Sequence, residues 1–316
     1  MKKFIYGIVT INVIVIVIFA ATYRFGIVKS SAIVGETESS EKYLNIVVTS
    51  KPLYYIVKDI TGDKHNVEYM FKTEQDILEY NYTEDSINNI EKKDLFFYNG
   101  ANLEPWIDVF TAKLKKDKLS TINVSRGVKL NLLDNPRKYG DKEIKENPYY
   151  LLGIEEYKIA LSNIKNSIEE KDPVNRQFYE KNYEKKLKEI SIVEEEMKEA
   201  IGKLNTYSII VSSDEFDYGL NSFNLTNVRL KRFDKNISDS ILKDQKAIII
   251  LEKSDSSNED IQSTIKNNNS QIIYLEKYNG DKDYLNVIKD NMKIIKDAKN
   301  IKDVKEHTLD INDLKK

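Results

Sequence analysis

The 316-residue chain contains no cysteine and only two histidines, His65 and His307. The absence of cysteine excludes disulfide bonds, thiolate metal sites and cysteine nucleophiles. His65 lies in a Gly-Asp-Lys turn and His307 in the C-terminal tail, so the two do not have the spacing of a metal site, and we expect both at the surface. The sequence also lacks a Gly-rich phosphate loop and a nucleophile-elbow motif. We therefore predict that the protein is not an enzyme.

The chain has no excess of charge of either sign. Its 49 Lys and Arg residues nearly balance its 51 Asp and Glu residues. No basic run with interleaved aromatic residues is present, so nucleic-acid binding is not expected. With 41% hydrophobic and 32% charged residues, the chain can bury a core, and its length predicts two lobes plus a membrane segment.

The N-terminus contains an uncharged run rich in Ile and Val, residues 4–22, which follows Lys2 and Lys3. At ~1.5 Å per residue in a helix, this run is just long enough to cross ~30 Å of hydrocarbon. It exceeds the ~7 to 15 apolar residues of a cleaved signal peptide, although cleavage after Ala21 remains an alternative. We predict a transmembrane anchor helix at residues 1–25, followed by a flexible, small and polar spacer at residues 26–42.

Short apolar runs alternate with helix-length segments in both halves of the remaining chain, as in a parallel α/β fold. The predicted strands are residues 44–49, 67–71, 95–98 and 122–125 in the first half and residues 208–211, 228–230, 247–251 and 271–275 in the second.

Between the two halves, apolar residues recur in steps of three and four, which predicts one long amphipathic helix at residues 173–204. Its register drifts over about four heptads, so packing across the chain's own lobes is favoured over a coiled coil. We thus predict an α/β protein with two (β/α)4-type parallel-sheet lobes joined by this linking helix. The N-terminal lobe spans residues 43–172, the C-terminal lobe residues 205–300, and a charged tail residues 301–316.

One segment, DLFFYNGANLEPW at residues 94–106, combines a buried strand, a tight Asn-Gly loop and a helix that opens near Pro105. It resembles a signature of the zinc- and manganese-importer substrate-binding proteins, which serve ABC transporters outside the cell membrane. Three further segments resemble the opening, linking-helix and closing parts of that family: LNIVVTSKPLYYIVKDITGDKHNV, DPVNRQFYEKNYEKKL and YLNVIKDNMKII. The resemblance covers roughly residues 44–295.

The resemblance implies a monomeric extracellular receptor that holds its ligand in the cleft between two lobes and passes it to an ABC permease. Most Gram-positive relatives are lipoproteins tethered through a cysteine. Because this chain has no cysteine, we expect its N-terminal helix to anchor it in the cell membrane as a single-pass protein, with its domain outside.

The family's four metal-ligand positions fall on Leu78, Tyr149, Ser213 and Glu276, with Glu79 beside the first and Asp214 beside the third. Leucine cannot coordinate a metal, and a neutral phenol with a pKa near ~10 is a poor ligand for zinc. Only Glu276 is a conservative replacement, so it is the one candidate metal ligand. The resemblance therefore implies a degenerate site, in which binding of zinc or manganese is doubtful.

Two kinds of ligand remain open. Glu79, Asp214, Glu215 and Glu276 could form an oxygen-only site for Mn²⁺ or Ca²⁺, unless they are solvated surface carboxylates. Four tyrosines could instead line a cleft for an organic ligand, unless they only fill the core: Tyr80, Tyr82, Tyr149 and Tyr150. Two functions also remain, a transport receptor and a non-transporting paralogue that acts as an interaction or regulatory module.

Overall fold

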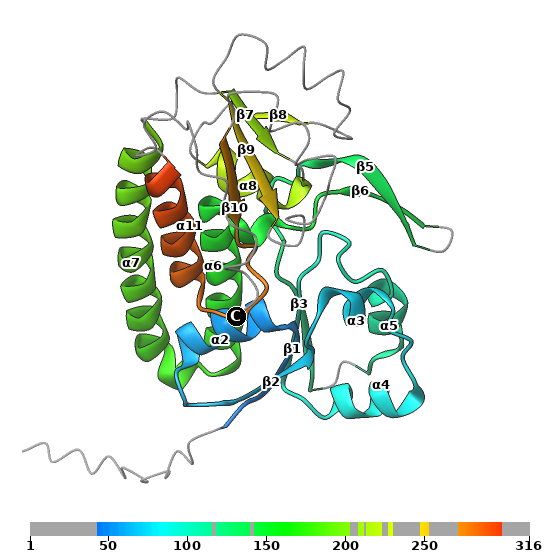
Figure 1. Ribbon diagram of the computed structural model, residues 1–316. Helices are drawn as coiled ribbons and strands as arrows, with labels where there is room; N and C mark the ends of the chain where they lie inside the picture. Colours follow the sequence, from blue (N-terminus) through cyan, green and yellow to red (C-terminus); the bar gives the residue numbers. More distant parts are fainter. Residues whose placement is uncertain are drawn as a thin grey trace, which may run out of the picture. The chain divides into compact units, whose positions relative to one another are not determined.

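The computed structural model describes residues 43–115, 118–139, 142–202, 208–211, 213–222, 227–229, 247–252 and 271–298 (Figure 1). The predicted anchor, spacer and C-terminal tail, as well as His307, lie outside these residues. Among the helices that are described, none is long and apolar enough to cross a membrane.

The N-terminal sheet has four parallel strands in the order β2-β1-β3-β4. Its strands are β1 (Asn45–Ser50), β2 (Asn66–Phe71), β3 (Leu95–Tyr98) and β4 (Ser120–Asn123), and its helices are α2 (Lys51–Thr61), α3 (Glu74–Leu78), α4 (Glu84–Glu91) and α5 (Ile107–Lys113). Ile46 of β1 pairs with Val67 on one side and Leu95 on the other. The central strands β1 and β3 are almost wholly buried, which explains their continuous apolar runs.

The C-terminal sheet repeats this arrangement with four parallel strands in the order β10-β9-β7-β8. Its strands are β7 (Ser208–Val211), β8 (Asn227–Arg229), β9 (Ala247–Glu252) and β10 (Gln271–Leu275), with helices η3 (Asp214–Phe216), α8 (Asp217–Asn221) and α11 (Tyr284–Ala298). Two parallel sheets with helices between their strands confirm the α/β class that the alternating pattern predicted.

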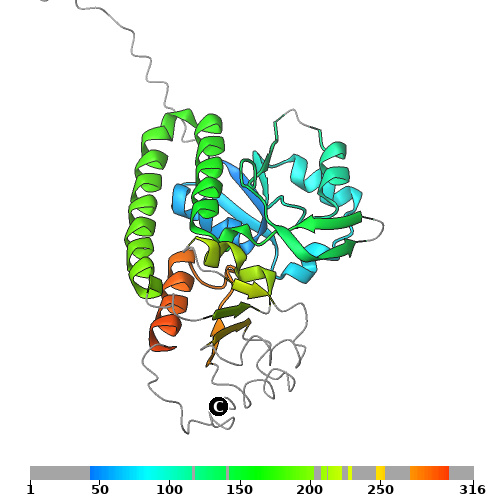
Figure 2. The ribbon, with the colours of Figure 1, turned by 90° about the horizontal axis from the view of Figure 1, so that it is seen from above.

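A long helix, α7 (Arg176–Gly202), lies beside α2, α6 (Ile154–Lys171) and α11 (Figures 1 and 2). The short turn η1 (Tyr150–Leu152) precedes α6, and η2 (Pro173–Asn175) leads directly into α7. The helix expected at residues 173–204 therefore corresponds to η2 and α7. Lys186 of α7 is buried between two carboxylates, 3.0 Å from Asp59 of α2 and 3.1 Å from Asp283 before α11. Helix α7 is thereby bonded to elements of both halves.

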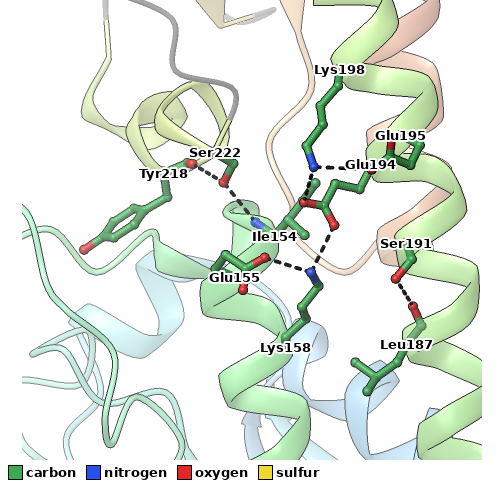
Figure 3. Close-up of polar contacts among 10 residues, drawn as sticks. All are labelled: Ile154, Glu155, Lys158, Leu187, Ser191, Glu194, Glu195, Lys198, Tyr218 and Ser222. Carbon is green, nitrogen blue, oxygen red and sulfur yellow. Dashed lines mark hydrogen bonds and ion pairs between the residues drawn. The ribbon is translucent and has the colours of Figure 1, made fainter.

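Ion pairs also join α6 to α7 (Figure 3). The Lys158 ammonium lies 2.8 Å from Glu155 of its own helix and 3.0 Å from Glu194 of α7. At the start of α6, the backbone N–H of Ile154 donates to the Ser222 hydroxyl at 3.2 Å. The N-terminal end of α6 is thus attached both to α7 and to the turn after α8.

A two-stranded antiparallel ribbon, β5 (Leu132–Tyr139) and β6 (Lys142–Glu146), extends on the side of the fold away from α7 (Figures 1 and 2). The sequence did not predict it. Its strands carry mostly charged and exposed side chains, so they lack the alternation of apolar residues that marks a half-buried strand.

Glu104, from the segment that carries the family resemblance, fixes the loop after β3. Its side chain has no exposed surface, and its carboxylate accepts hydrogen bonds from the Thr49 hydroxyl at 2.5 Å, the Asn99 N–H at 2.8 Å and the Gly100 N–H at 3.1 Å. Gly100 has a φ of +74°, and a Cβ there would lie 2.0 Å from Asn123 Oδ1. The Asn-Gly pair and the glutamate therefore specify one loop conformation.

The only tryptophan of the chain, Trp106, packs in a cluster of aromatic rings beneath the N-terminal sheet. Its indole N–H donates to the Ile77 carbonyl at 2.8 Å. The rings of Phe71, Tyr80 and Phe110 meet it edge to face at centroid distances of 5.9, 4.9 and 5.3 Å. This cluster attaches helices α3 and α5 to the strands.

The expectation that His65 lies at the surface is wrong, because this residue is only 5% exposed. Its Nδ1 accepts from the Leu44 N–H at 3.4 Å, and its Nε2 lies 2.7 Å from the Tyr179 hydroxyl, which donates to Asp172 at 2.5 Å. The turn after α2 folds against the start of α7, and this contact encloses the His65 side chain. The nearby Asp63 in the same turn stays exposed.

Candidate functional site

A cavity of about 400 Å³ lies where the carboxyl ends of strands from both sheets converge, which is where open α/β sheets bind ligands. The N-terminal sheet contributes residues after β1, β2 and β3, and the C-terminal sheet contributes residues after β7 and β10. The connection before α6 completes the wall. The lining residues are Ser50, Lys51, Pro52, Phe71, Lys72, Thr73, Glu74, Ile77, Asn99, Leu103, Pro148, Tyr149, Leu151, Leu152, Glu215, Lys277, Tyr278, Asn279 and Asp281.

Tyr149 contacts both a carboxylate and a guanidinium in this pocket. Its hydroxyl donates to Glu74 Oε1 at 2.7 Å, and the Arg137 guanidinium lies 3.2 Å from the same oxygen and 5.1 Å from the centre of the Tyr149 ring. Burial, together with the Glu74 carboxylate, raises the pKa of Tyr149 far above its ordinary value. The phenol therefore stays protonated and acts as a hydrogen-bond donor.

Ion pairs engage the other carboxylates of the wall. Glu215, which is 7% exposed, lies 3.4 Å from the Lys277 ammonium. Asp281 lies 2.7 Å from the ammonium of Lys51, at the start of α2. The second pair joins the loop after β10 to the N-terminal half of the fold, and both of its residues line the pocket.

The loop after β10 also packs closely on the start of α2. The Tyr278 hydroxyl donates to the Pro52 carbonyl at 3.3 Å. Gly280 has a φ of +77°, and a Cβ on it would lie 2.4 Å from Lys51 Cβ and 2.6 Å from the Pro52 nitrogen. Only glycine fits this approach, so residues 277–281 are held against α2.

Of the site residues that the sequence suggested, the structure places Tyr149 and Glu215 in the pocket wall. Glu79 is exposed at the end of α3 and accepts a hydrogen bond from Gln75 at 2.8 Å. The carboxylate of Glu276 lies 2.8 Å from the Lys282 ammonium, and the next residue, Lys277, lines the pocket instead.

Ser213 and Asp214 lie just outside the wall, at the start of the short turn η3. The Ser213 hydroxyl accepts from the Glu215 N–H at 3.2 Å and caps this turn. Asp214 Oδ1 accepts from the Asp134 N–H at 3.4 Å, which connects the turn to β5. Their effect on the pocket is indirect, because they position Glu215.

The other tyrosines that the sequence suggested for a cleft pack against the hydrophobic core, with Tyr80 and Tyr82 partly buried. Tyr80 and Tyr82 lie against Trp106 and Phe110 at centroid distances of 4.9 and 5.3 Å. Tyr150 is fully buried, and its hydroxyl donates to the Asn99 carbonyl at 2.8 Å. None of these three lines the pocket.

Sequence reasoning missed Lys72 and Glu74, which directly follow β2. A signal was present, since Thr73 and Asp76 form a capping box that starts α3 immediately after the strand. A polar segment between a strand and a capped helix lies at the carboxyl edge of a parallel sheet, where both residues are found.

The carboxylates of the pocket wall are engaged by other side chains of the protein. Within the described part of the chain, no three His, Asp or Glu side chains gather so that they could hold a metal ion. A zinc site needs nitrogen, sulfur or carboxylate ligands at ~2.0 to 2.3 Å. Here Glu74 and Glu215 are instead bonded to Tyr149, Arg137 and Lys277.

Among curated proteins, the metal ABC transporter substrate-binding lipoprotein ScbA of Streptococcus cristatus is 31% identical over 207 residues, 63% of this chain and 66% of that protein. The manganese ABC transporter substrate-binding lipoprotein scaA of Streptococcus gordonii is 32% identical over 195 residues, 60% of this chain and 62% of that protein. This chain thus spans slightly less than two thirds of the length of these relatives.

Solved structures share the fold. The lipoprotein YcdH from Bacillus subtilis superposes with a TM-score of 0.65 at 21% identity, covering 81% of this chain and 99% of that chain. Zn(II)-bound AdcA from Streptococcus pneumoniae gives a TM-score of 0.64 at 22% identity, covering 81% of this chain and 58% of that chain. The model of the family "zinc-uptake complex component A periplasmic" matches residues 46–298. The chain therefore belongs to the zinc-uptake complex component A family.

Proposed function

We propose that the protein is a monomeric extracellular substrate-binding component of an ABC importer, and that its pocket takes a small organic solute in place of a bare zinc or manganese ion. Family membership and the names of the curated relatives support the receptor class. Those relatives are named lipoproteins. Since this chain has no cysteine, the apolar run at residues 4–22 would attach it to the membrane beside its permease.

The observation that carries the change of solute is the chemistry of the 400 Å³ pocket. By the resemblance, three of the family's four metal positions fall on Leu78, Tyr149 and Ser213, and the fourth, Glu276, is paired with Lys282. Pockets of ~300 to 1,000 Å³ with a largely apolar wall and a few polar groups suit organic molecules. The apolar part of this wall includes Phe71 and Leu103.

A second candidate is an interaction module that binds no solute. It is favoured by the internal pairing of the wall's charges, Lys51 with Asp281 and Lys277 with Glu215. The first pair joins the two halves without a ligand, and the second joins two loops of the C-terminal half. In this alternative the protein would dock on its membrane partner in one fixed conformation.

Calorimetric and thermal-unfolding titrations of the full chain in lipid nanodiscs distinguish these functions. The titrants are Zn²⁺, Mn²⁺, Ca²⁺ and a library of organic solutes. A solute at about a hundredfold its Kd should stabilise the fold by about 2.7 kcal/mol. Replacing the half-buried Leu103 with tryptophan fills the pocket and should abolish this gain. The matched control Leu132→Trp, at a site that is 69% exposed on β5, should retain it.

Each result has a definite meaning. Saturable one-to-one binding of Zn²⁺ or Mn²⁺ that Glu276→Ala abolishes would show a rebuilt metal site and refute the organic solute. A complete lack of binding and stabilisation with every titrant would favour the interaction module over the receptor.

A further inference from the structure

Almost every polar side chain in the pocket wall already has a partner inside the protein. Thr73 caps α3, Tyr149 donates to Glu74, and the Tyr278 hydroxyl donates to a backbone carbonyl. The remaining hydroxyl, amide and charged groups are paired as well: Ser50 with Asn99, Asn279 with Asp281, Lys51 with Asp281, and Lys277 with Glu215. A ligand that used any of these groups would have to break an existing interaction.

Lys72 is different. It lines the pocket directly after β2, its side chain is exposed, and its ammonium has no hydrogen bond or ion pair with any residue of the described chain. The wall's three carboxylates, by contrast, are each matched by a cation: Glu74 by Arg137, Glu215 by Lys277 and Asp281 by Lys51. Within the described residues, Lys72 is thus the one uncompensated charge of the wall.

We propose that the pocket selects a small organic anion, an apolar body that carries one carboxylate, with Lys72 as the residue that recognises the charge. This inference rests on the proposed function, because it names the class of solute for the same pocket. The apolar body would contact Phe71, Ile77 and Leu103, while the carboxylate accepts hydrogen bonds from the Lys72 ammonium at the mouth.

The opposite charge is disfavoured by the same wall. A ligand ammonium would have to replace Lys277 at Glu215 or displace Tyr149 and Arg137 from Glu74, and it would be repelled by Lys72. A neutral alcohol would fit the apolar wall but gain nothing from the charge. Because Lys72 is solvent-exposed, the preference for the anion should be about fivefold, the size of an exposed charge pair.

The test uses three probes with one body and different head groups: 3-phenylpropionate, 3-phenylpropylamine and 3-phenylpropan-1-ol. Saturation-transfer NMR on the full chain in nanodiscs measures their affinities near pH 7. The signal that Leu103→Trp removes is assigned to the pocket, so that partition of the probes into lipid is subtracted. The variants are Lys72→Gln and the control Lys188→Gln, an exposed lysine of α7 with no ion pair among the described residues.

We expect the carboxylate to bind about fivefold more tightly than the alcohol and the amine, and Lys72→Gln, but not Lys188→Gln, to remove this difference. Equal affinities of the carboxylate and the alcohol, or a preference that survives Lys72→Gln, would overturn the anion assignment while leaving the pocket as a binding site. If none of the three probes gives a pocket signal, the anion assignment is also overturned. If the solute library also fails to bind, the receptor function fails with it.

Discussion

His65 makes the folded state sensitive to mild acid. Burial lowers the pKa of His65 below its ordinary value of 6.5, and the partial compensation by Asp172 is smaller. The unfolded chain therefore takes up this proton at a higher pH than the folded chain does. Stability from His65 is complete above pH 6.5 and is lost as the pH falls from there through the folded pKa.

We predict that the wild-type chain loses more stability between pH 7.5 and pH 5 than a His65→Gln variant, whose glutamine does not titrate. Urea unfolding at a series of pH values measures the difference. Burial raises the pKa of Asp59 to about 6, so protonation of Asp59 stabilises the fold as the pH falls. Because both proteins contain Asp59, this opposite contribution cancels when their stabilities are compared. Parallel stability curves for the two proteins would contradict the prediction.

The sequence located the region of the pocket but only two of its side chains, Tyr149 and Glu215. Tyr149 was identified through the family resemblance, and the structure places it in the wall. Positions Glu79 and Glu276 were obtained by counting along the chain, but α3 ends at Leu78, so Glu79 falls beyond the helix while Glu74, at its start, reaches Tyr149. Which of two neighbouring residues faces a cavity depends on local backbone rotation, and linear spacing does not specify it.

Helix α7 connects the two halves through the buried ammonium of Lys186. It lies 3.0 Å from Asp59 and 3.1 Å from Asp283. We predict that Lys186→Met lowers the free energy of unfolding by about 3 to 5 kcal/mol at pH 7, because two carboxylates are left close together without their cation. The loss should shrink near pH 5, where Asp59 becomes protonated.

Chemical denaturation at both pH values measures this effect. Lys188→Met, an exposed position of the same helix, is the matched control and should change stability by less than about 0.5 kcal/mol. A similar loss for both variants, or a loss that does not depend on pH, would exclude the ionic explanation.

Strands and helices were predictable to different degrees. Runs of Ile, Val, Leu and Phe predicted four strands whose ends agree within two residues with those of β3, β7, β9 and β10. The buried residues of these strands are apolar, so hydrophobicity alone marks them. The β5-β6 ribbon has no such run of apolar residues, and its stability depends on contacts such as Arg137 with Glu74, which join residues far apart in the sequence.

The molecule's two halves meet tightly where Gly280 lies against the start of α2. We predict that Gly280→Ala destabilises the fold by about 3 kcal/mol, because it adds a steric clash with Lys51 to the strain of a positive φ. Gly127→Ala is the matched control. Its φ is +85°, but a Cβ there has nothing within 4 Å, so only the strain of about 1 to 2 kcal/mol applies.

Hydrogen exchange should then show faster exchange at residues 50–54 and 277–281 in Gly280→Ala but not in Gly127→Ala. Such a pattern would mean that the contact between the halves has opened. Equal destabilisation of both variants, with unchanged exchange at these segments, would mean that the close approach of Gly280 contributes nothing beyond its φ.

The position of Trp106 gives this protein a built-in optical reporter. It is the only tryptophan among 316 residues, so all indole emission comes from one known place. Its ring meets Phe71 at a centroid distance of 5.9 Å, its N–H is bonded to the Ile77 carbonyl, and both of these residues line the pocket. A ligand that moves this part of the wall will shift the fluorescence of the unlabelled wild-type protein, so occupancy can be followed in real time without a dye.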